Sequence, residues 1–405
     1  MKSIFTLLFT TLYLTMFSIN WLPFGPQGIH ANNILFGAGD SAYTVICTNQ
    51  GVCVNNGPGY TWNMFTYSIP AWEAIPYDSS SVLLAMGNGS YSDGIYRYDL
   101  INNTFNVLAW VPFSTFIKYC PFNNTYYAGS RYYGLLSSVD GIQWDTVPFF
   151  KNRGCAAMDI YGQHIVVTQE NNIYATYYSD DGGVTWTQSM SNIPIHDLSF
   201  DQNGTLYGVF TGQSNSSGLY LSHNFGHTCN MEYYIDNMNV VGFDVMGNLF
   251  TGFHGALPPY EGVAVYDTLS NYYSLLNAGL PNKNINRFKF NPVMSSIAIF
   301  VCTDSGVYLC NDYLTILNNN YPEDKSVKIY PNPAHEKIKI ELTEKADIEI
   351  INQYGQIIEN PGLVYSKSVL DISTLSAGVY FIKVTPDKAL YKKRQGFIVK
   401  KFIKQ

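Results

Sequence analysis

The sequence predicts an all-β protein in which a seven-bladed β-propeller is followed by a small immunoglobulin-like β-sandwich. Three observations lead to this fold class. The 405 residues are rich in aromatic side chains (16%, with 33 Tyr and 24 Phe) and poor in charged ones (13%), which favours strands over helices. A motif returns at intervals of about 42 residues through most of the chain. A different pattern of short alternating strands begins near residue 327.

The N-terminal residues 1–31 have the features of a secretory signal peptide. Lys2 supplies a positive charge, residues 4–17 are largely apolar, and Ala31 is a small residue suited to a cleavage site. The alternative is a membrane anchor, but the apolar run is short for the roughly 20 residues that span a bilayer. We therefore expect an exported protein whose propeller occupies residues 32–320.

Each repeat contains four short apolar stretches separated by polar turns. In one unit they lie at 195–200, 205–210, 218–222 and 229–234. The residues that close the last turn of a unit, such as Trp144, Trp186 and Cys229, follow one another at intervals of about 42 residues, and degenerate copies bring the number of units to seven. This pattern predicts a β-propeller, because stacking buries both faces of each four-stranded sheet and ring closure protects the sheet edges.

The best preserved turn, YSDDGGVTW at 178–186, contains two adjacent acids. Paired carboxylates beside an aromatic residue could indicate glycoside hydrolysis. The same residues suit a structural turn, because Asp181 can accept hydrogen bonds from its own backbone, Gly183 permits a positive φ, and Trp186 can be buried between blades. We expect the structural role.

These turns resemble the Asp-box, or BNR, repeat of sialidase-like and sortilin-like propellers, Ser-x-Asp-x-Gly-x-Thr-Trp. Residues 179–186 match it at every position, and the other copies depart at one or more positions. In that family the box joins the third and fourth strands of a blade, at the rim away from the usual ligand face. The resemblance implies structural roles for Ser179, Asp181, Gly183, Thr185, Trp186, Ser138, Asp140, Trp144, Ser222, Gly226 and Trp62.

The seven cysteines include no Cys-x-x-Cys pair, which argues against thioredoxin-like and zinc-ribbon sites. Cys47 and Cys53 flank a predicted hairpin turn, as do Cys302 and Cys310, so a disulfide within each pair is geometrically feasible. The sequence leaves open whether either bond forms, and the odd count leaves at least one thiol free.

A domain boundary is predicted near residue 326, with residues 321–326 as a linker. Residues 327–405 carry 13 Lys and Arg against 8 Asp and Glu, whereas residues 1–326 carry 10 against 22. Six or seven short alternating strands in the tail predict the β-sandwich. Because the acidic large domain has no basic stripe, nucleic acid is not an expected partner.

The tail at 327–405 resembles the type A C-terminal sorting domain of the type IX, or Por, secretion system. The matching residues are Tyr330, Pro331, Asn332, Pro333, Gly355, Gly378, Tyr380, Lys400 and Lys401. The resemblance implies that a translocon in the outer membrane of a Gram-negative bacterium reads the tail. It also implies that a sortase-like surface peptidase removes the tail, and that the cargo is released or attached to surface glycolipid.

Two kinds of glycoside hydrolase are the enzyme alternatives. A sialidase needs three arginines around its substrate carboxylate and opens with an Arg-Ile-Pro motif, which this chain lacks; the region contains only Arg97, Arg131, Arg153 and Arg287. A xyloglucanase-like enzyme needs two carboxylates across a cleft, and such clefts usually lie between two propellers. The candidate acids on inner strands are Glu73, Asp159 and Asp197.

We expect a non-catalytic protein that binds a carbohydrate or protein ligand and uses no cofactor or metal. His223 and His227 lie four residues apart, but no third metal ligand accompanies them. The candidate ligand-binding residues on first strands and adjoining loops are Trp72, Tyr119, His196, Asp197 and Arg287. For Trp72 and Tyr119 we expect core packing instead, and Asp197 and Arg287 could both face the central channel.

Overall fold

The computed structural model describes most of the chain between residues 21 and 404. The residues outside the description are 1–20, 38–42, 56–60, 67–68, 171–173, 192, 194, 211–216, 245–246, 256–260, 268–271, 292–297, 311–326, 343–344, 353–356, 377, 387–397 and 405. No helix in the described part is long and apolar enough to cross a membrane.

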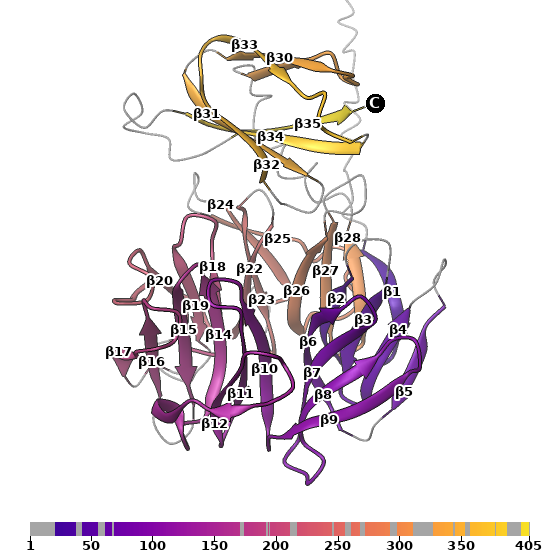
Figure 1. Ribbon diagram of the computed structural model, residues 1–405, viewed down its shortest axis with the longest axis vertical. Helices are drawn as coiled ribbons and strands as arrows, with labels where there is room; N and C mark the ends of the chain where they lie inside the picture. Colours follow the sequence, from indigo (N-terminus) through magenta and orange to yellow (C-terminus); the bar gives the residue numbers. More distant parts are fainter. Residues whose placement is uncertain are drawn as a thin grey trace, which may run out of the picture.

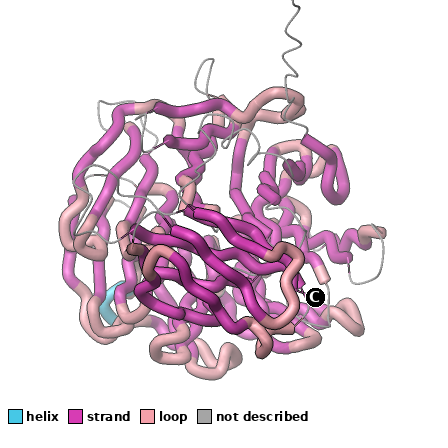
Figure 2. The backbone as a smooth tube through the Cα atoms, turned by 90° about the horizontal axis from the view of Figure 1, so that it is seen from above, coloured by secondary structure: helices cyan, strands magenta, loops and turns pink. Residues whose placement is uncertain are grey.

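The large domain consists of seven four-stranded antiparallel sheets arranged around a ring (Figures 1 and 2). The first sheet contains β2 (Ala31–Phe36), β3 (Thr44–Thr48), β4 (Gly51–Asn55) and β5 (Asn63–Thr66). The second contains β6 (Ala71–Asp78), β7 (Ser81–Met86), β8 (Gly94–Asp99) and β9 (Thr104–Trp110). The third contains β10 (Ser114–Cys120), β11 (Thr125–Ser130), β12 (Gly134–Ser138) and β13 (Asp145–Thr146), followed by the 3₁₀ turn η1 (Pro148–Phe150).

The remaining four sheets continue the same order. The fourth contains β14 (Cys155–Tyr161), β15 (His164–Gln169), β16 (Ala175–Ser179) and β17 (Thr187–Ser191). The fifth contains β18 (Asp197–Phe200), β19 (Leu206–Phe210), β20 (Gly218–Ser222) and β21 (Asn230–Tyr234). The sixth contains β22 (Met238–Phe243), β23 (Leu249–Phe253), β24 (Val263–Asp267) and β25 (Tyr272–Leu275), and the seventh contains β26 (Ile285–Asn291), β27 (Ala298–Thr303) and β28 (Gly306–Cys310) with β1 (Trp21–Gln27). The predicted seven-bladed propeller is confirmed.

The seventh blade is completed by the N-terminal strand β1, which corrects the predicted start of the propeller at residue 32. Strand β1 pairs antiparallel with β28, and Trp21 lies opposite Cys310. Trp21 and Phe24 are both buried. Residues 21–27 therefore belong to the ring, and a signal peptide that ended at Ala31 would include a strand of the seventh blade.

We predict that the N-terminus of the exported protein lies at or before Trp21. Cleavage after Ala31 would remove the outer strand of the seventh blade and expose the edge of β28, which is unfavourable. N-terminal sequencing of the protein recovered from the cell surface or medium tests this. A mature chain that begins at residue 32 would contradict it.

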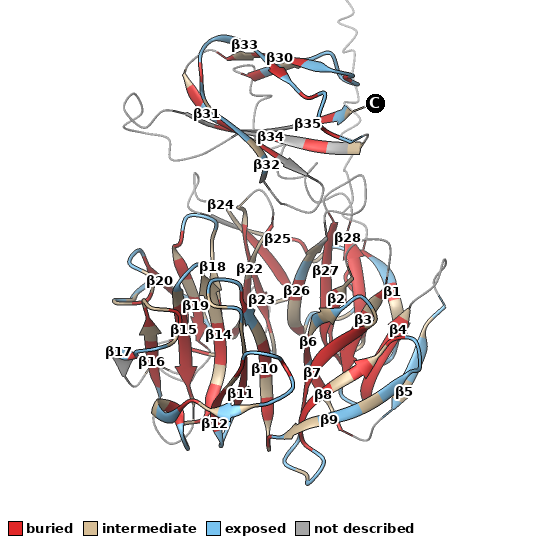
Figure 3. Ribbon diagram, viewed as in Figure 1, coloured by how far each residue is buried: buried red, intermediate tan, exposed pale blue. Residues whose placement is uncertain are grey.

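The middle strands of the blades are buried on both faces, as the stacking of sheets requires (Figure 3). All six residues of β7 are buried, whereas every described residue of the outer strand β5 is at least partly exposed. Apolar side chains from adjacent sheets form the clusters between blades; Trp186, for example, packs edge-on against Phe150 at 4.8 Å.

All seven cysteine thiols are free, so neither of the two hairpin disulfides that the sequence left open is present. Cys47 lies opposite Val52, and Cys53 lies opposite Ile46. This offset of one residue directs the two thiols to opposite faces of the sheet. Cys302 lies opposite Val307 and Cys310 lies opposite Ile299, so these two cysteines are offset by three residues. Because this offset is also odd, their thiols point to opposite faces of the sheet as well.

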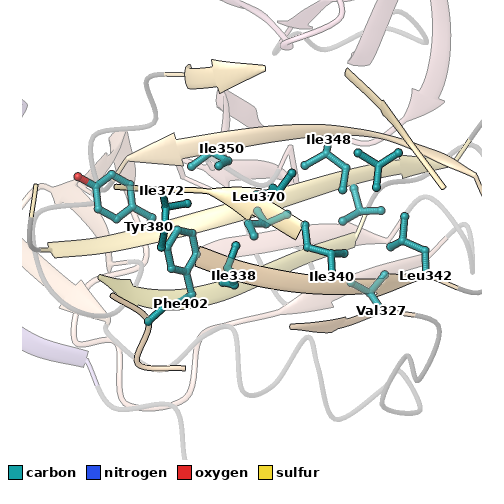
Figure 4. Packing of buried hydrophobic residues seen from close by; sticks show 14 of the residues in the cluster. Val327, Ile338, Ile340, Leu342, Ile348, Ile350, Leu370, Ile372, Tyr380 and Phe402 are labelled. Carbon is teal, nitrogen blue, oxygen red and sulfur yellow. The ribbon is translucent and has the colours of Figure 1, made fainter. Parts of the chain in front are cut away.

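The C-terminal domain packs a three-stranded sheet against a four-stranded one. The first contains β29 (Val327–Tyr330), β30 (Lys337–Leu342) and β33 (Lys367–Asp371), and the second contains β32 (Ile357–Val364), β31 (Ala346–Asn352), β34 (Gly378–Pro386) and β35 (Ile398–Lys404). Ile338 and Ile340 from one sheet meet Ile348, Ile350 and Phe402 from the other in the shared core (Figure 4). Among the predicted sorting-signal residues, Tyr380 is buried and its ring stacks on Phe402. Gly355 lies outside the described residues, and only the backbone of Lys400 and Lys401 is described. The predicted linker at 321–326 also lies outside the described residues.

Candidate functional site

Antiparallel strand order gives the propeller two faces with different connections. The box face carries the turns between first and second strands and between third and fourth strands. The far face carries the turns between second and third strands and the connections from one blade to the next. Strand β28 ends at the box face, so the chain leaves the propeller toward the C-terminal domain on that side.

The turn at 179–186 lies on the box face and uses its acid internally. The Asp181 carboxylate accepts hydrogen bonds from the N–H groups of Val184 (3.0 Å) and Thr185 (2.9 Å) and from the Thr185 hydroxyl (2.6 Å). The Ser179 hydroxyl donates to Asp181 Oδ1 (2.7 Å) and accepts from the Gly183 N–H (2.8 Å). Although partial burial opposes ionisation, these bonds dominate and lower the pKa of Asp181 to about 2. The carboxylate therefore holds the turn.

Two other turns repeat this geometry. Asp140 accepts from the N–H groups of Ile142 and Gln143, both at 2.8 Å. In the copy at 222–229, Asn224 replaces the acid and its Oδ1 accepts from the Thr228 N–H at 3.0 Å. The tryptophan that closes a turn donates to a turn carbonyl, Trp186 to Gly183 at 3.0 Å and Trp144 to Gly141 at 3.1 Å. The predicted box residues Ser138, Ser222 and Gly226 make the corresponding turn bonds in their own blades, whereas the buried Nε1 of Trp62 has no hydrogen-bond partner among the described residues.

The central channel contains charged side chains from five inner strands. Arg287 on β26 reaches Asp197 on β18 across the intervening strand β22, with 2.6 Å between Nη1 and Oδ1. On the other side, Lys118 Nζ lies 2.8 Å from Glu73 Oε1. Each ion pair joins two different blades, so the pairs tie the inner wall of the ring together.

The three channel acids also bind the backbone of the following blade. Glu73 accepts the Ile117 N–H (3.1 Å) and Asp159 accepts the Phe200 N–H (2.7 Å). In the same way, Asp197 accepts the N–H of Val241 on β22 at 3.1 Å. These bonds cover the junctions between blades 2 and 3, 4 and 5, and 5 and 6.

The other four junctions are bridged by a side chain at the start of the inner strand. Asn32, Thr115, Asn239 and Asn286 each donate to a carbonyl at the start of the next inner strand, at 2.8–3.0 Å. Each of these donors lies at a register shift where its strand bulges. All seven junctions therefore carry a bond from an inner-strand side chain to the neighbouring backbone, and the channel acids are part of this set.

Burial and charge shift the pKa values of the channel groups in different directions. Burial raises the pKa of Asp159 to about 6, although Lys118 and the Phe200 N–H oppose the shift. Burial and the nearby Lys118 lower the pKa of Lys289. For Lys118, burial favours the neutral amine, but Glu73 and Asp159 outweigh it and raise the pKa.

We predict that Asp159→Asn stabilises the protein at pH 8 by up to about 3 kcal/mol. The folded pKa of about 6 lies above the ordinary value of 3.8, so ionising this carboxyl costs more in the folded state. The penalty is complete above pH 6 and absent below about 3.8, while the Asn carbonyl can still accept the Phe200 N–H. Urea unfolding of the two proteins at pH 8 and pH 4 measures the difference, which should shrink at pH 4.

Asp181→Asn is the matched control, because it should change the free energy of unfolding at pH 8 in the opposite direction. Its carboxyl has a folded pKa below 3.8, so it stabilises the protein above that pH and loses this contribution as pH falls toward 2. The substitution should therefore destabilise the protein at pH 8. An Asp159→Asn variant that is less stable than the natural protein at pH 8 would contradict the assignment.

The far face over blades 2 and 3 carries a group of aromatic side chains, which we call the aromatic platform: Trp72, Tyr91, Phe113 and Tyr132. Trp72 donates its indole N–H to the Gly87 carbonyl at 2.6 Å and keeps 39% of its surface exposed. Phe113 and Tyr132 meet edge to face at 4.7 Å. Tyr91 is 97% exposed at the tip of the loop 87–93.

The loop 87–93 is organised by Asp93, which is fully buried. Its carboxylate accepts from the N–H groups of Asn88, Gly89 and Ser90, from the Ser90 hydroxyl, and from the N–H of Phe113, at 2.6–3.2 Å. Phe113 has a φ of 53°, which is uncommon for a residue with a bulky side chain. A single carboxylate thus fixes the loop and the aromatic residue beside it.

The five predicted ligand-binding residues fall in three different places. Trp72 and His196 lie at the far face, and His196 Nδ1 is 3.9 Å from Glu170, which also meets Arg131 at 3.4 Å. Asp197 and Arg287 lie in the channel and bind each other.

Tyr119 lies toward the box face, beside a cavity of about 480 Å³ that Lys118 and Asp159 also line. The expectation that Trp72 and Tyr119 belong to the core is wrong, because 39% and 40% of their surfaces are exposed.

Sequence reasoning did not single out Asp93, Lys118, Tyr91 or Tyr132. Lys118 could have been found by aligning the inner strands, because it occupies the same position as Asp159 in the following strand. Asp93 precedes Gly94 in a Gly- and Ser-rich loop, a composition that indicates a turn but not a buried carboxylate.

Comparison with known families identifies the tail. The sequence model of one protein family, described as the secretion system C-terminal sorting domain, matches residues 328–403. A search of curated protein sequences gives no significant match.

Solved structures of similar shape share the fold at low sequence identity. One is PorZ, described as an essential bacterial surface component of the type IX secretion system of Porphyromonas gingivalis (TM-score 0.51, 13% identity, 94% of this chain and 60% of that one). Another is the extracellular domain of the putative one-component system BT4673 of B. thetaiotaomicron (0.56, 13%, 94% and 53%). A third is YCF48 bound to D1 peptide (0.52, 11%, 74% and 96%).

The chain thus spans about three fifths of the PorZ structure and about half of BT4673. The predicted destination is confirmed: residues 328–403 are a secretion system C-terminal sorting domain, and the protein is exported through type IX secretion to the cell surface or the extracellular space.

Proposed function

We propose that the protein is a non-catalytic binding protein of the cell surface or extracellular space, and that it contacts its ligand with the aromatic platform. The main support for this proposal is the contrast between the central channel and the aromatic platform. Glu73 and Asp197 are engaged in ion pairs, and all three channel acids accept a backbone N–H of the next blade, whereas the platform exposes aromatic rings on loops held in place by Asp93. Preorganised aromatic side chains bind a ligand at low entropic cost.

A hydrolase is the less supported alternative. Retaining and inverting glycosidases need two carboxyl groups roughly 5–9.5 Å apart that can reach the substrate. Glu73 and Asp197 each serve both an ion pair and a backbone N–H, so neither is available for proton transfer without loosening the ring.

A paired assay tests binding against turnover. The purified protein is applied to a glycan array and a peptide array, and separately to a panel of polysaccharides in which new reducing ends are counted. We expect binding to a member of either array that Trp72→Ala weakens at least about ten-fold, and no turnover. Turnover that Asp197→Asn abolishes would overturn the proposal.

We further propose that the type IX translocon reads the tail and that a sortase-like surface peptidase removes it, with release of the propeller or attachment to surface glycolipid. The sorting domain matched at residues 328–403 supports this, and cleavage would separate it from the propeller. Intact mass measurement of the exported protein tests the step. A surface form that retains residues 327–405 in full would contradict it.

A further inference from the structure

We propose that the aromatic platform binds a neutral polysaccharide chain, whose sugar rings stack on Trp72 and on the tyrosines of the neighbouring loops. This inference rests on the proposed function and specifies its ligand. Three observations carry it: the kind of apolar side chain that the far face exposes, the rigidity of the loops, and the balance of charge around them.

Exposed apolar side chains differ sharply between the two faces. Within the described connections and strand ends of the far face, the exposed large hydrophobic residues are aromatic apart from Leu275, namely Trp72, Tyr91, Trp110, Tyr132, Tyr133, Tyr174 and Tyr234. The box-face turns instead expose Ile101, Phe122, Val139, Ile142 and Val184. Tyrosine combines a flat apolar ring with a hydroxyl, which suits a ligand with apolar C–H faces and hydroxyl edges, whereas protein interfaces also bury aliphatic groups at their centre.

The loops that carry the rings are held by internal bonds. Asp93 fixes the loop 87–93, and a Cβ at Gly89 would lie only 2.2 Å from the Phe113 ring, so the loop backbone packs against that ring. In the next blade, the Ser130 hydroxyl accepts the N–H groups of Tyr132 (3.3 Å) and Tyr133 (3.0 Å). A polysaccharide therefore meets rings whose positions are already set.

The charges near the platform compensate one another. Arg131 lies beside Tyr132, and its guanidinium meets Glu170, with His196 on the other side of that carboxylate. The loop 87–93 contributes the polar side chains of Asn88, Ser90 and Ser92, and its acid Asp93 is buried. The platform residues and the loop 87–93 include no unpaired cation, and the exposed Lys151 stands outside them on the connection whose Asn152 N–H meets the Tyr133 carbonyl at 3.1 Å, so the platform itself favours an uncharged chain.

Affinity gel electrophoresis tests this ligand class. The full protein is run through native gels that contain β-glucan, mannan, xylan or the polyanion alginate, and its retardation is compared with that in a blank gel. We expect retardation by at least one neutral polysaccharide. Tyr91→Ala removes a 97% exposed ring and should weaken the binding about ten-fold without affecting folding.

Phe122→Ala is the matched control, because this ring is also exposed (56%) but belongs to the box face. It should leave the retardation unchanged. Retardation by alginate alone, or equal loss in the Phe122 and Tyr91 variants, would overturn the inference. If no polysaccharide retards the protein while a peptide of the array binds in a Trp72-dependent way, the polysaccharide inference fails and the proposed binding function stands.

Discussion

Trp21→Ala is expected to lower the free energy of unfolding by about 3–5 kcal/mol, which is a large part of the stability of a typical domain. The Trp21 ring is 4% exposed and packs with Val263, Leu276 and Leu280 in the cluster between the sixth and seventh blades. Its indole N–H also donates to the Leu276 carbonyl at 2.7 Å. The substitution leaves a cavity and an unpaired carbonyl between the sixth blade and the strand that completes the seventh. Urea unfolding measures the change.

Leu22→Ala provides the control in the same strand. Leu22 follows Trp21 directly but points to the other side, where 44% of its surface is exposed. Its replacement should change the unfolding free energy by less than about 0.5 kcal/mol. Equal effects of the two substitutions would show that β1 does not close the seventh blade through the contacts described.

Asp197→Ala is expected to cost about 2–4 kcal/mol. The substitution removes the carboxylate that faces Arg287 at 2.6 Å and leaves the Val241 N–H without its acceptor. Asp197 is 6% exposed, so the pair is shielded from water, and removing one member of a shielded pair strands the other charge. The cost stays below that of a fully buried pair because the Arg287 side chain is about one third exposed to water. Chemical unfolding at neutral pH measures it.

The double variant Asp197→Leu with Arg287→Leu separates the ion pair from the loss of packing. Replacing both charges with apolar side chains removes the stranded cation, so the double variant should be more stable than Asp197→Leu alone. Strictly additive losses would mean that the two side chains do not interact across the channel.

The fold could be predicted because its signal is repeated. Each blade repeats the same alternation of apolar strands and polar turns, so weak copies are supported by strong ones such as 179–186. The place of β1 could not be predicted in this way. Strand β1 pairs with β28 in space, but in the sequence nearly the whole propeller lies between them. The apolar residues of β1 also suit the end of a signal peptide.

The candidate site was predicted less completely, because its geometry depends on contacts between residues that lie far apart in the sequence. Alignment of the inner strands predicts that Asp197 and Arg287 occupy equivalent positions in their blades. It does not predict that the two side chains form an ion pair across the intervening blade. The platform depends on loops whose shape comes from tertiary bonds, such as those of Asp93 with Phe113, twenty residues later in the chain. Likewise, no local pattern shows that the thiols of Cys47 and Cys53 point to opposite faces of the sheet, because a one-residue offset in the strand pairing decides this.

Hydrogen–deuterium exchange with and without the polysaccharide or peptide that binds is the most direct test of the division between a structural box face and a binding far face. We expect ligand to slow exchange in residues 87–93, 111–113 and 130–133 and to leave the turns at 138–144, 179–186 and 222–229 unchanged. Slower exchange confined to the box turns or the channel strands would place the ligand on the other side of the propeller and contradict the account.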